Sequence, residues 1–595
     1  MSIFDVLALF GGLALFLFGM NVMGDGLTRA AGGKMERILE KLTSTPIKGV
    51  LLGAAVTAVI QSSSATTVMV VGFVNSGIMK LRQAVGIIMG ANIGTTVTSW
   101  ILSLSGIQGD SIWIQMLKPS SFSPILAVIG IAFLMFSKNE KKHDIGMIFL
   151  GFTILMYGMD AMSGAVAPLA DVPEFANVLL MFSNPILGMI VGTLFTAIIQ
   201  SSSASVGILQ ALCMTGAVTY GTALPIIMGQ NIGTCVTALL SSIGAKKNAK
   251  RAAFVHLYFN LIGTILFMIV FYSINAFVNF GVLQDMATPA GIAVIHSIFN
   301  ILTTIVLLPF GKGLEKLATL TIREKEEPVE EIAELVPLKH LDARFLEQPA
   351  FAVTQSMDVM NQMAGYSAEA LYDSLELLKD YSDEKWQRVE ALEDIVDKYE
   401  DELGTYLAKV SGKELAEEDS KRVSNGLHCI GDLERISDHA LAIAEIYAKM
   451  HKEEMVFSDK AMAELNLYSN AVYEIMSMTC KALNEDDMKI AKRIEPLEEV
   501  INGLNATIKK QHIKRLQKGK CTIELGIALE NLLNNYERVA DHCSNVAASL
   551  LQVKTDSFDT HEYLNRVKQE SNVEFQAMYS MYKDCLLYTS PSPRD

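Results

Sequence analysis

The sequence predicts an all-α protein with two parts, a polytopic membrane domain followed by a soluble helical bundle. The first part consists of long apolar runs, and the second is charged and rich in helix-forming residues. Residues 1–312 carry 16 Lys and Arg and 11 Asp and Glu, which leaves 33 basic and 53 acidic residues to the rest of the chain. Both parts contain internal repeats. We expect two inverted repeats with re-entrant hairpins in the membrane domain, and two three-helix repeats in the bundle.

The repeat in the apolar half is marked by a polar motif. Residues 61–65, Gln-Ser-Ser-Ser-Ala, recur as residues 200–204, at an offset of 139. The same offset maps Asn-Ile-Gly-Thr at residues 92–95 onto residues 231–234. Several landmarks in one register do not arise by chance, so the sequence predicts a duplicated structural unit.

Seven apolar runs in this half are long enough to cross a bilayer core of about 30 Å. They lie near residues 4–23, 84–104, 121–137, 145–165, 222–243, 252–275 and 289–310. Residues 46–77 and 185–216 differ, because they are apolar at both ends and polar in the middle. Each arm of roughly 15 residues makes only roughly 22 Å of helix. We expect two re-entrant hairpins with the Ser-rich motif at the tip.

The basic residues of the loops predict the orientation of the chain. With seven crossings and two hairpins, the basic clusters fall on one side of the membrane, and Lys118 is the exception. The positive-inside rule then places the N-terminus outside and the soluble domain in the cytoplasm. Three crossings separate the starts of the two repeats, which inverts the second copy. We expect a multi-pass protein of the inner (cytoplasmic) membrane, with the lipid bilayer as a partner.

Each repeat offers groups that bind small ions. The motif supplies an amide and three hydroxyls, and the following helix points the positive end of its dipole at the tip. These groups suit a tetrahedral oxyanion, whereas loose carbonyls and hydroxyls suit Na⁺. No Lys or Arg lies inside a span, so an anion would need co-transported cations, which favours symport. The candidate ligands are Gln61, Ser62, Ser63, Ser64, Thr66, Asn92 and Thr95, and in the second repeat Gln200, Ser201, Ser202, Ser203, Ser205, Asn231 and Thr234.

Two later segments place His and Asn four residues apart on one helix face, at His256 and Asn260 and again at His296 and Asn300. Hydrogen bonding between helices is the simpler interpretation, and a role in proton or substrate binding is the alternative. Small polar residues of the Ser-rich motifs could likewise only hold packed helices together, but their duplication in register favours a binding role.

The duplicated QSSS motif with its Asn-Gly-Thr partners resembles the type II sodium/phosphate cotransporter family over residues 1 to about 312. The resemblance implies sodium-coupled transport of inorganic phosphate by alternating access, with Na⁺ as the coupling ion and no enzymatic activity. It also implies that the two QSSS motifs form the ion and phosphate site. A membrane phosphate sensor and a transporter of a related oxyanion stay open as alternatives.

We expect a transport domain at residues 1–312, with repeats at about 4–137 and 145–275 and a last span at 289–310. A linker at 313–344 and a helical domain at 345–585 follow. Residues 586–595 break the helical pattern, and we exclude this tail, whose origin is doubtful, from the fold. The net charge of −20 after residue 312 argues against nucleic-acid binding. The scattered cysteines predict neither disulfides nor a thiolate metal site.

The soluble half carries its own repeat. Glu-Arg-x-x-Asp-His at residues 434–439 recurs at residues 537–542, at an offset of 103. Glu and Asp four residues apart share a helix face, and two such helices could bring four carboxylates together. This spacing is compatible with a di-metal site, and equally with a solvated acidic face that pairs with Arg435 and Arg538. A membrane-anchored metalloenzyme is a further alternative, although no nucleophile supports it.

This half resembles the PhoU family of phosphate-signalling regulators, which have two three-helix repeats and an E-x-x-x-D signature in each helix. The resemblance implies a regulatory domain, a di- or multinuclear transition-metal cluster, and a homodimer or a phosphate-signalling protein as partner. The metal ligands that it implies are Glu393, Asp397, Glu434 and Asp438 in one bundle, and Glu498, Glu537 and Asp541 in the other. Asn502 stands where the pattern has an acid, which puts the second cluster in question.

Overall fold

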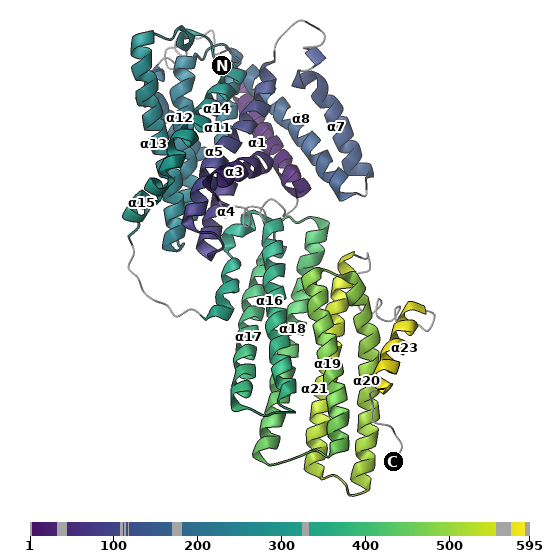
Figure 1. Ribbon diagram of the computed structural model, residues 1–595. Helices are drawn as coiled ribbons and strands as arrows, with labels where there is room; N and C mark the ends of the chain where they lie inside the picture. The colour runs from purple at the N-terminus through teal and green to yellow at the C-terminus, as the bar shows by residue number, and fades with distance from the viewer. Residues whose placement is uncertain are drawn as a thin grey trace. The chain divides into compact units, whose positions relative to one another are not determined.

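The computed structural model describes residues 3–31, 45–107, 111, 115–116, 118–137, 139–168, 181–323, 332–554 and 573–588. The regular elements of these residues are helices, apart from one isolated bridge between Thr219 and Met286 (Figure 1). The predicted all-α class is confirmed. The chain divides into two compact units, Met1–Val329 and Glu330–Asp595, and each is described by itself.

The first unit holds the apolar helices of the chain. Seven of the described helical segments are long and apolar enough to cross a membrane, and they coincide with the seven predicted spans. The helices are α1 (Ile3–Ala31), α3 (Pro46–Ile60), α4 (Ser63–Ser76), α5 (Leu81–Ser103), α7 (Pro119–Phe136), α8 (Glu140–Val166), α10 (Pro185–Ile199), α11 (Ser202–Cys213), α12 (Tyr220–Ser241), α13 (Lys247–Val278), α14 (Pro289–Leu307) and α15 (Gly311–Thr321).

The helices α1 and α8 are repeat mates that pack against each other through glycines. A Cβ atom added at Gly19 would lie 2.3 Å from the backbone nitrogen of Leu155, and one added at Gly158 would lie 2.3 Å from that of Phe16. The offset of 139 converts each contact into the other, so the pair has a local twofold symmetry. Residue 16 faces residue 158 while residue 19 faces residue 155, which makes the two helices antiparallel.

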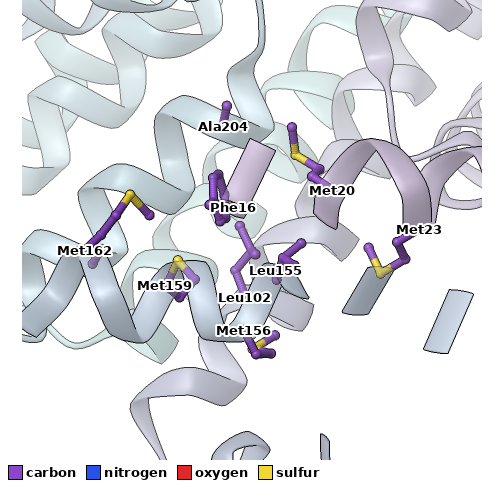
Figure 2. Packing of buried hydrophobic residues seen from close by; sticks show 10 residues of the cluster. Phe16, Met20, Met23, Leu102, Leu155, Met156, Met159, Met162 and Ala204 are labelled. Atoms are coloured by element: carbon purple, nitrogen blue, oxygen red, sulfur yellow. The ribbon is translucent and has the colours of Figure 1, made fainter. Parts of the chain in front are cut away.

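Large side chains fill the space around this helix pair. Figure 2 shows the buried cluster, which gathers residues from α1, α5, α8 and α11. Its members are Phe16, Met20, Met23, Leu102, Leu155, Met156, Met159, Met162, Ala204 and Ala211. Ala204 is the last residue of the second QSSSA motif, so this apolar core packs directly against the start of α11.

The first helix of each hairpin packs on the following span at a glycine. A Cβ atom added at Gly90 of α5 would lie 2.0 Å from the carbonyl oxygen of Val50 on α3. Gly229 of α12 stands in the same relation to Met189 on α10, also at 2.0 Å. No side chain fits at either position, and the two backbones therefore meet directly. The repeat thus preserves the hairpin packing as well as the motif.

The second helix of each hairpin lies between helices of both repeats. Besides its own neighbours, α4 contacts α12 and α13, whereas α11 contacts α5 and α14. The segments 253–260 and 293–300 are similar to each other at an offset of 40, and they lie in α13 and α14. The repeat mates α12 and α5 are contacted by α13 and α14, respectively. Each repeat thus has one of the last two spans packed on the corresponding helix.

The second unit is a pair of three-helix bundles. The helices α16, α17 and α18 contact one another, as do α19, α20 and α21, and α18 packs against α21 to join the bundles. The helices are α16 (Pro349–Glu376), α17 (Asp383–Ser411), α18 (Glu417–Lys452), α19 (Asp459–Glu485), α20 (Met488–Gln517), α21 (Ile523–Lys554) and α23 (Val573–Tyr588). This arrangement agrees with the predicted bundle fold.

The predicted linker, residues 313–344, begins inside α15, and its residues 324–331 lie outside the described residues. Its end forms two short 3-10 helices, Ala333–His340 and Ala343–Glu347. The hydroxyl of Tyr399 donates to the carbonyl of Glu334 at 2.7 Å, so this end packs on the second unit. Of the predicted tail, residues 589–595 lie outside the described residues.

Replacing Gly90 with Ala should destabilise the first unit, because the methyl group would overlap the Val50 carbonyl. We expect a loss of about 1–3 kcal/mol, seen as a lower thermal midpoint of the purified protein in detergent. Gly11→Ala on α1 is the control, since nothing lies within 4 Å of its added Cβ atom. Equal midpoints for Gly90→Ala and Gly11→Ala would show that the two backbones do not meet.

Candidate functional site

The two Ser-rich motifs form matching turns between paired helices. Gln61 ends α3 with φ 60°, and Gln200 ends α10 with φ 59°, both in the left-handed region. Such a backbone is costly for a residue with a side chain, and strained residues of this kind cluster at functional sites. Ser62 and Ser201 then begin α4 and α11, because their Oγ atoms accept hydrogen bonds from backbone N–H groups three residues on, at 3.1 and 3.2 Å.

A second pair of hydroxyls ties the arms of each hairpin together. Thr57 donates to Thr66 at 3.0 Å, and Thr196 donates to Ser205 at 2.8 Å. The predicted ligands Thr66 and Ser205 therefore hold the hairpins in shape. Thr57 and Thr196 were missed in the sequence, although they are register mates that lie in apolar runs.

Four serine hydroxyls at the tips are not used in hydrogen bonds of the described structure. Among the described residues, those of Ser63, Ser64, Ser202 and Ser203 take part in no hydrogen bond, whereas Ser62 and Ser201 serve as helix caps. Ser63, Ser202 and Ser203 are nonetheless buried, with exposed fractions of 3%, 6% and 5%. Each tip thus combines free hydroxyls with the N-terminal N–H groups of a helix. This combination can bind an anion or orient around a hydrated cation.

The Asn-Gly-Thr elements lie within α5 and α12. The side-chain amides of Asn92 and Asn231 each donate to the carbonyl four residues earlier in their own helix, at 2.9 Å. This bond uses the amide nitrogen of each side chain, and the amide oxygen is the atom that could serve as a cation ligand. Thr95 and Thr234 bond to their own helices in the same way, at 3.1 and 3.0 Å.

The two halves differ at the glutamines. Gln61 is buried; it donates to the Ala58 carbonyl and accepts from Thr98 of α5 at 2.9 Å. Its repeat mate Gln200 is exposed. Thr237, the mate of Thr98, has a buried hydroxyl without a hydrogen-bond partner. Among the described residues, the glutamine of the first tip thus bonds to the following span, whereas no such bond is found for the glutamine of the second tip.

Links between the motifs and the other predicted ligands are few. In the second repeat, Gln230 donates to the carbonyl of Ser205 at 3.1 Å, which ties α11 to the helix of Asn231. No hydrogen bond among the described residues joins the two tips directly. The structure therefore brings each motif to its own Asn-Gly-Thr helix, and sequence reasoning missed the residues that make these links, Thr98 and Gln230.

The His and Asn pairs join helices, as the simpler interpretation predicted. His296 Nδ1 lies 2.8 Å from the hydroxyl of Ser99 on α5, and Asn260 donates to the sulfur of Cys235 on α12 at 3.3 Å. His256 differs, because both of its ring nitrogens are buried without a partner. The contacts involve helices that also carry the Asn-Gly-Thr elements.

The acidic residues of the first bundle are close together and paired with an arginine. Arg435 lies 3.4 Å from Glu434 and 3.0 Å from Asp438. Burial, and then the negative charges of Asp397 and Asp438, raise the pKa of Glu393 from 4.5 to about 7. These carboxylates repel one another, and the arginine relieves part of the repulsion.

The acidic residues of the second bundle are bonded to amides and cations. Asn502 donates to Glu498, Asn505 donates to Glu537 at 2.6 Å, and Arg538 lies 3.7 Å from Asp541. In the part of the chain that the structure describes, no three His, Cys, Asp or Glu residues form a group that could hold a metal ion. The side chains thus do not fit the cluster that the PhoU resemblance implies, and they agree with the ion-pair interpretation.

Comparison with known proteins identifies both units. A model described as Na⁺/Pi-cotransporter matches residues 15–164 and 170–285. YqeW of Bacillus subtilis is 31% identical over 315 residues, which cover 53% of this chain and 97% of that protein. The chain belongs to the Na⁺/Pi-cotransporter family. A model of the PhoU domain matches residues 360–447 and 465–550, one match in each bundle.

Two further relatives of this cotransporter family member have descriptive names. YjbB of Salmonella typhimurium, named for inorganic phosphate export, is 24% identical over 563 residues, covering 94% of this chain and 99% of that protein. The sodium-dependent phosphate transport protein 2A of Rattus norvegicus is 39% identical over 97 residues, covering 16% of this chain and 15% of that protein. Family and spans together make this a multi-pass membrane protein with a pair of PhoU domain matches.

Replacing Glu393 with Gln should make α17 less sensitive to pH. A raised pKa in the folded state means that stability is lost as pH rises from 4.5 through about 7, because the charged form is disfavoured there. Amide hydrogen exchange of α17 in the full-length protein should be slower in the variant than in the wild type at pH 8, and similar at pH 4. Glu390 is exposed on the same helix, so Glu390→Gln should give the same ratio of variant to wild-type exchange rate at pH 8 as at pH 4. If the ratio of variant to wild-type exchange rate for Glu393→Gln were the same at both pH values, the raised pKa of Glu393 would be contradicted.

Proposed function

We propose that the protein couples Na⁺ movement to the transport of inorganic phosphate across the cytoplasmic membrane by alternating access, with the PhoU-like unit as its regulator. The observation that carries the proposal is the duplicated tip. Each copy places unbonded serine hydroxyls at the N-terminus of a helix, inside a protein of the Na⁺/Pi-cotransporter family.

Phosphate would be bound by the serine hydroxyls and by the helix ends. Hydroxyls and backbone N–H groups donate hydrogen bonds to the phosphate oxygens, and the dipoles of α4 and α11 favour the negative charge. Ser63, Ser64, Ser202 and Ser203 are the residues free to do so, while Gln61 and Gln200 flank them. Ser62 and Ser201 contribute by capping, which fixes where each helix begins.

Sodium would offset the charge of the phosphate. Neither tip carries a Lys or Arg, and an unpaired anion in a low-dielectric site is costly. The side-chain oxygens of Asn92 and Asn231 and the hydroxyls of Thr95 and Thr234 are suitable sodium ligands on the adjoining spans. The printed name of the rat relative, which describes sodium-dependent phosphate transport, supports this coupling.

The membrane arrangement that we propose has inverted repeats. The antiparallel packing of the repeat mates α1 and α8 supports it, since mates that run in opposite directions belong to inverted units. The helices α3 and α10 have 15 residues each, which is too short for a bilayer core of about 30 Å and supports re-entrant hairpins. The basic loops favour an external N-terminus and a cytoplasmic second unit.

The direction of net flux follows from the gradients in an alternating-access mechanism. The name of YjbB, which matches both units of this chain, favours export of phosphate from the cytoplasm. A regulator on the cytoplasmic side fits that task, because it would act where excess phosphate accumulates. A sensor without transport is the second candidate, and flux separates the two.

Replacing Ser63 or Ser202 with Ala should lower sodium-dependent phosphate flux at least tenfold and leave the thermal midpoint unchanged. These hydroxyls make no hydrogen bond in the described structure, so only ligand contacts are lost. Ser62→Ala and Ser201→Ala should lower flux and also stability, by about 1 kcal/mol, because each removes a helix cap. Labelled phosphate flux in proteoliposomes, with and without a Na⁺ gradient, measures the effect.

Ser76→Ala, at the other end of α4 from Ser63, is the matched control and should transport normally. If wild-type protein binds phosphate but moves none under any gradient, the sensor is the better description. If both Ser63→Ala and Ser202→Ala transport at the wild-type rate, the tips are not the site.

A further inference from the structure

A buried glutamine joins three helices of the membrane unit. Gln210 of α11 is fully buried, and its side-chain amide donates to the carbonyl of Ser99 on α5 at 3.0 Å and to that of Pro289 on α14 at 2.9 Å. The helix α11 begins with the second Ser-rich motif, about two turns before Gln210. The glutamine therefore fixes the position of a motif helix against the other repeat.

The hydroxyl of Ser99 extends this contact. It lies 2.8 Å from Nδ1 of His296, another buried residue of α14. Ser99 thus bonds to α14 through its side chain and to α11 through its carbonyl. We call Gln210, Ser99, His296 and Pro289 the polar clamp. Its four members lie on α5, α11 and α14, and the clamp is buried throughout.

The other half of the unit has no such clamp. The offset of 139 maps Ser99 onto Ala238, and it maps Val71 onto Gln210. The offset of 40 maps His256 onto His296, and both ring nitrogens of His256 are buried without a partner. The interface of α4 with α12 and α13 therefore lacks the hydroxyl and the amide that its counterpart uses.

The clamp also adjoins a docked tip. Thr98, which donates to Gln61 at 2.9 Å, precedes Ser99 on α5. The second tip, at the start of the clamp helix α11, differs, because Gln200 is exposed and the hydroxyl of Thr237 is buried without a partner. The clamp therefore joins α5, the span that bonds to Gln61, to α11, the helix that follows the exposed Gln200. The two repeats thus share one backbone scaffold and differ in these side-chain contacts.

We propose that the polar clamp sets the conformational preference of the transporter, and that Gln210 is a positioning residue for the second motif. The proposal rests on the proposed function. When the two halves of an inverted-repeat transporter exchange conformations, the site opens to the other side. Breaking the clamp then loses three buried hydrogen bonds that Val71 and Ala238 cannot replace. The conformation described here is favoured over its counterpart by that difference.

The repeat itself supplies the substitutions for a test. Gln210→Val and Ser99→Ala install the residues of the other half and remove the clamp. The double variant Val71→Gln/Ala238→Ser installs the clamp residues in the other half. Gln210→Met keeps the volume of the side chain if valine impairs folding. Thr264→Val is the control, because it removes a fully buried hydroxyl that donates from α13 to the Met228 carbonyl at 3.4 Å, outside the clamp.

The measurement is the KM for phosphate in right-side-out and in inside-out membrane vesicles. A shift between two conformations raises the apparent affinity at one face and lowers it at the other. We expect Gln210→Val to change the ratio of the two KM values by roughly 5- to 30-fold. The double variant should shift the ratio in the opposite sense, and Thr264→Val should leave it unchanged. A variant that is only less stable would lower the flux at both faces and keep the ratio.

The proposal is wrong if Gln210→Val and Gln210→Met leave the ratio unchanged, or if removal and transplantation of the clamp shift it in the same sense. A wild type that transports no phosphate would refute the proposed function but not the clamp. The clamp is then tested by labelling Gln200→Cys with an impermeant thiol reagent in the same two vesicle preparations. Loss of the clamp should change the ratio of labelling rates at the two faces. An unchanged ratio would overturn the proposal that the clamp sets the conformational preference.

Discussion

The membrane unit depends on direct backbone contact between helices at glycines. Irregular backbone at membrane depth survives only where protein covers it, and the re-entrant hairpins that we propose would place the two motif turns there. Gly90 and Gly229 let α3 and α10 lie directly on the following spans, while Gly19 and Gly158 bring α1 and α8 together. Glycine contacts that obey the repeat offset thus build a symmetric scaffold, and the motif turns are held at its corresponding positions.

On this scaffold some polar side chains hold the structure together and others are available to a ligand. Ser62 caps α4, and Thr66 bonds to the other arm of the hairpin. The hydroxyls that remain for a ligand are therefore those of Ser63 and Ser64. Polar contacts that break the symmetry, at Gln61 and Gln210, distinguish the halves. In the mechanism that we propose, a symmetric backbone with unequal polar contacts would give two conformations of similar but unequal energy, one of which is the resting state of the transporter.

The repeats, the spans and the bundles could be predicted from sequence, because offsets of 139 and 103 and apolar run lengths report them directly. The capping role of Ser62 follows from its place before a helix. The bond between Thr98 and Gln61 could not be predicted, since it joins residues 37 apart whose helices had no assigned packing. The spacing of Glu434 and Asp438 places both on one helix face, but it does not distinguish a metal ion from an arginine as their partner. The structure shows that the partner is Arg435.

The central claim is that the two motif hairpins enter the membrane from opposite sides. Cysteines at the repeat mates Ser44 and Ser183, in a background without the exposed Cys585, test it directly; Ser44 lies outside the described residues. An impermeant thiol reagent applied to intact cells should label position 183 and spare position 44, and inside-out vesicles should show the reverse. Labelling of both positions from the same side would contradict the inverted arrangement and, with it, the site formed by two opposed tips.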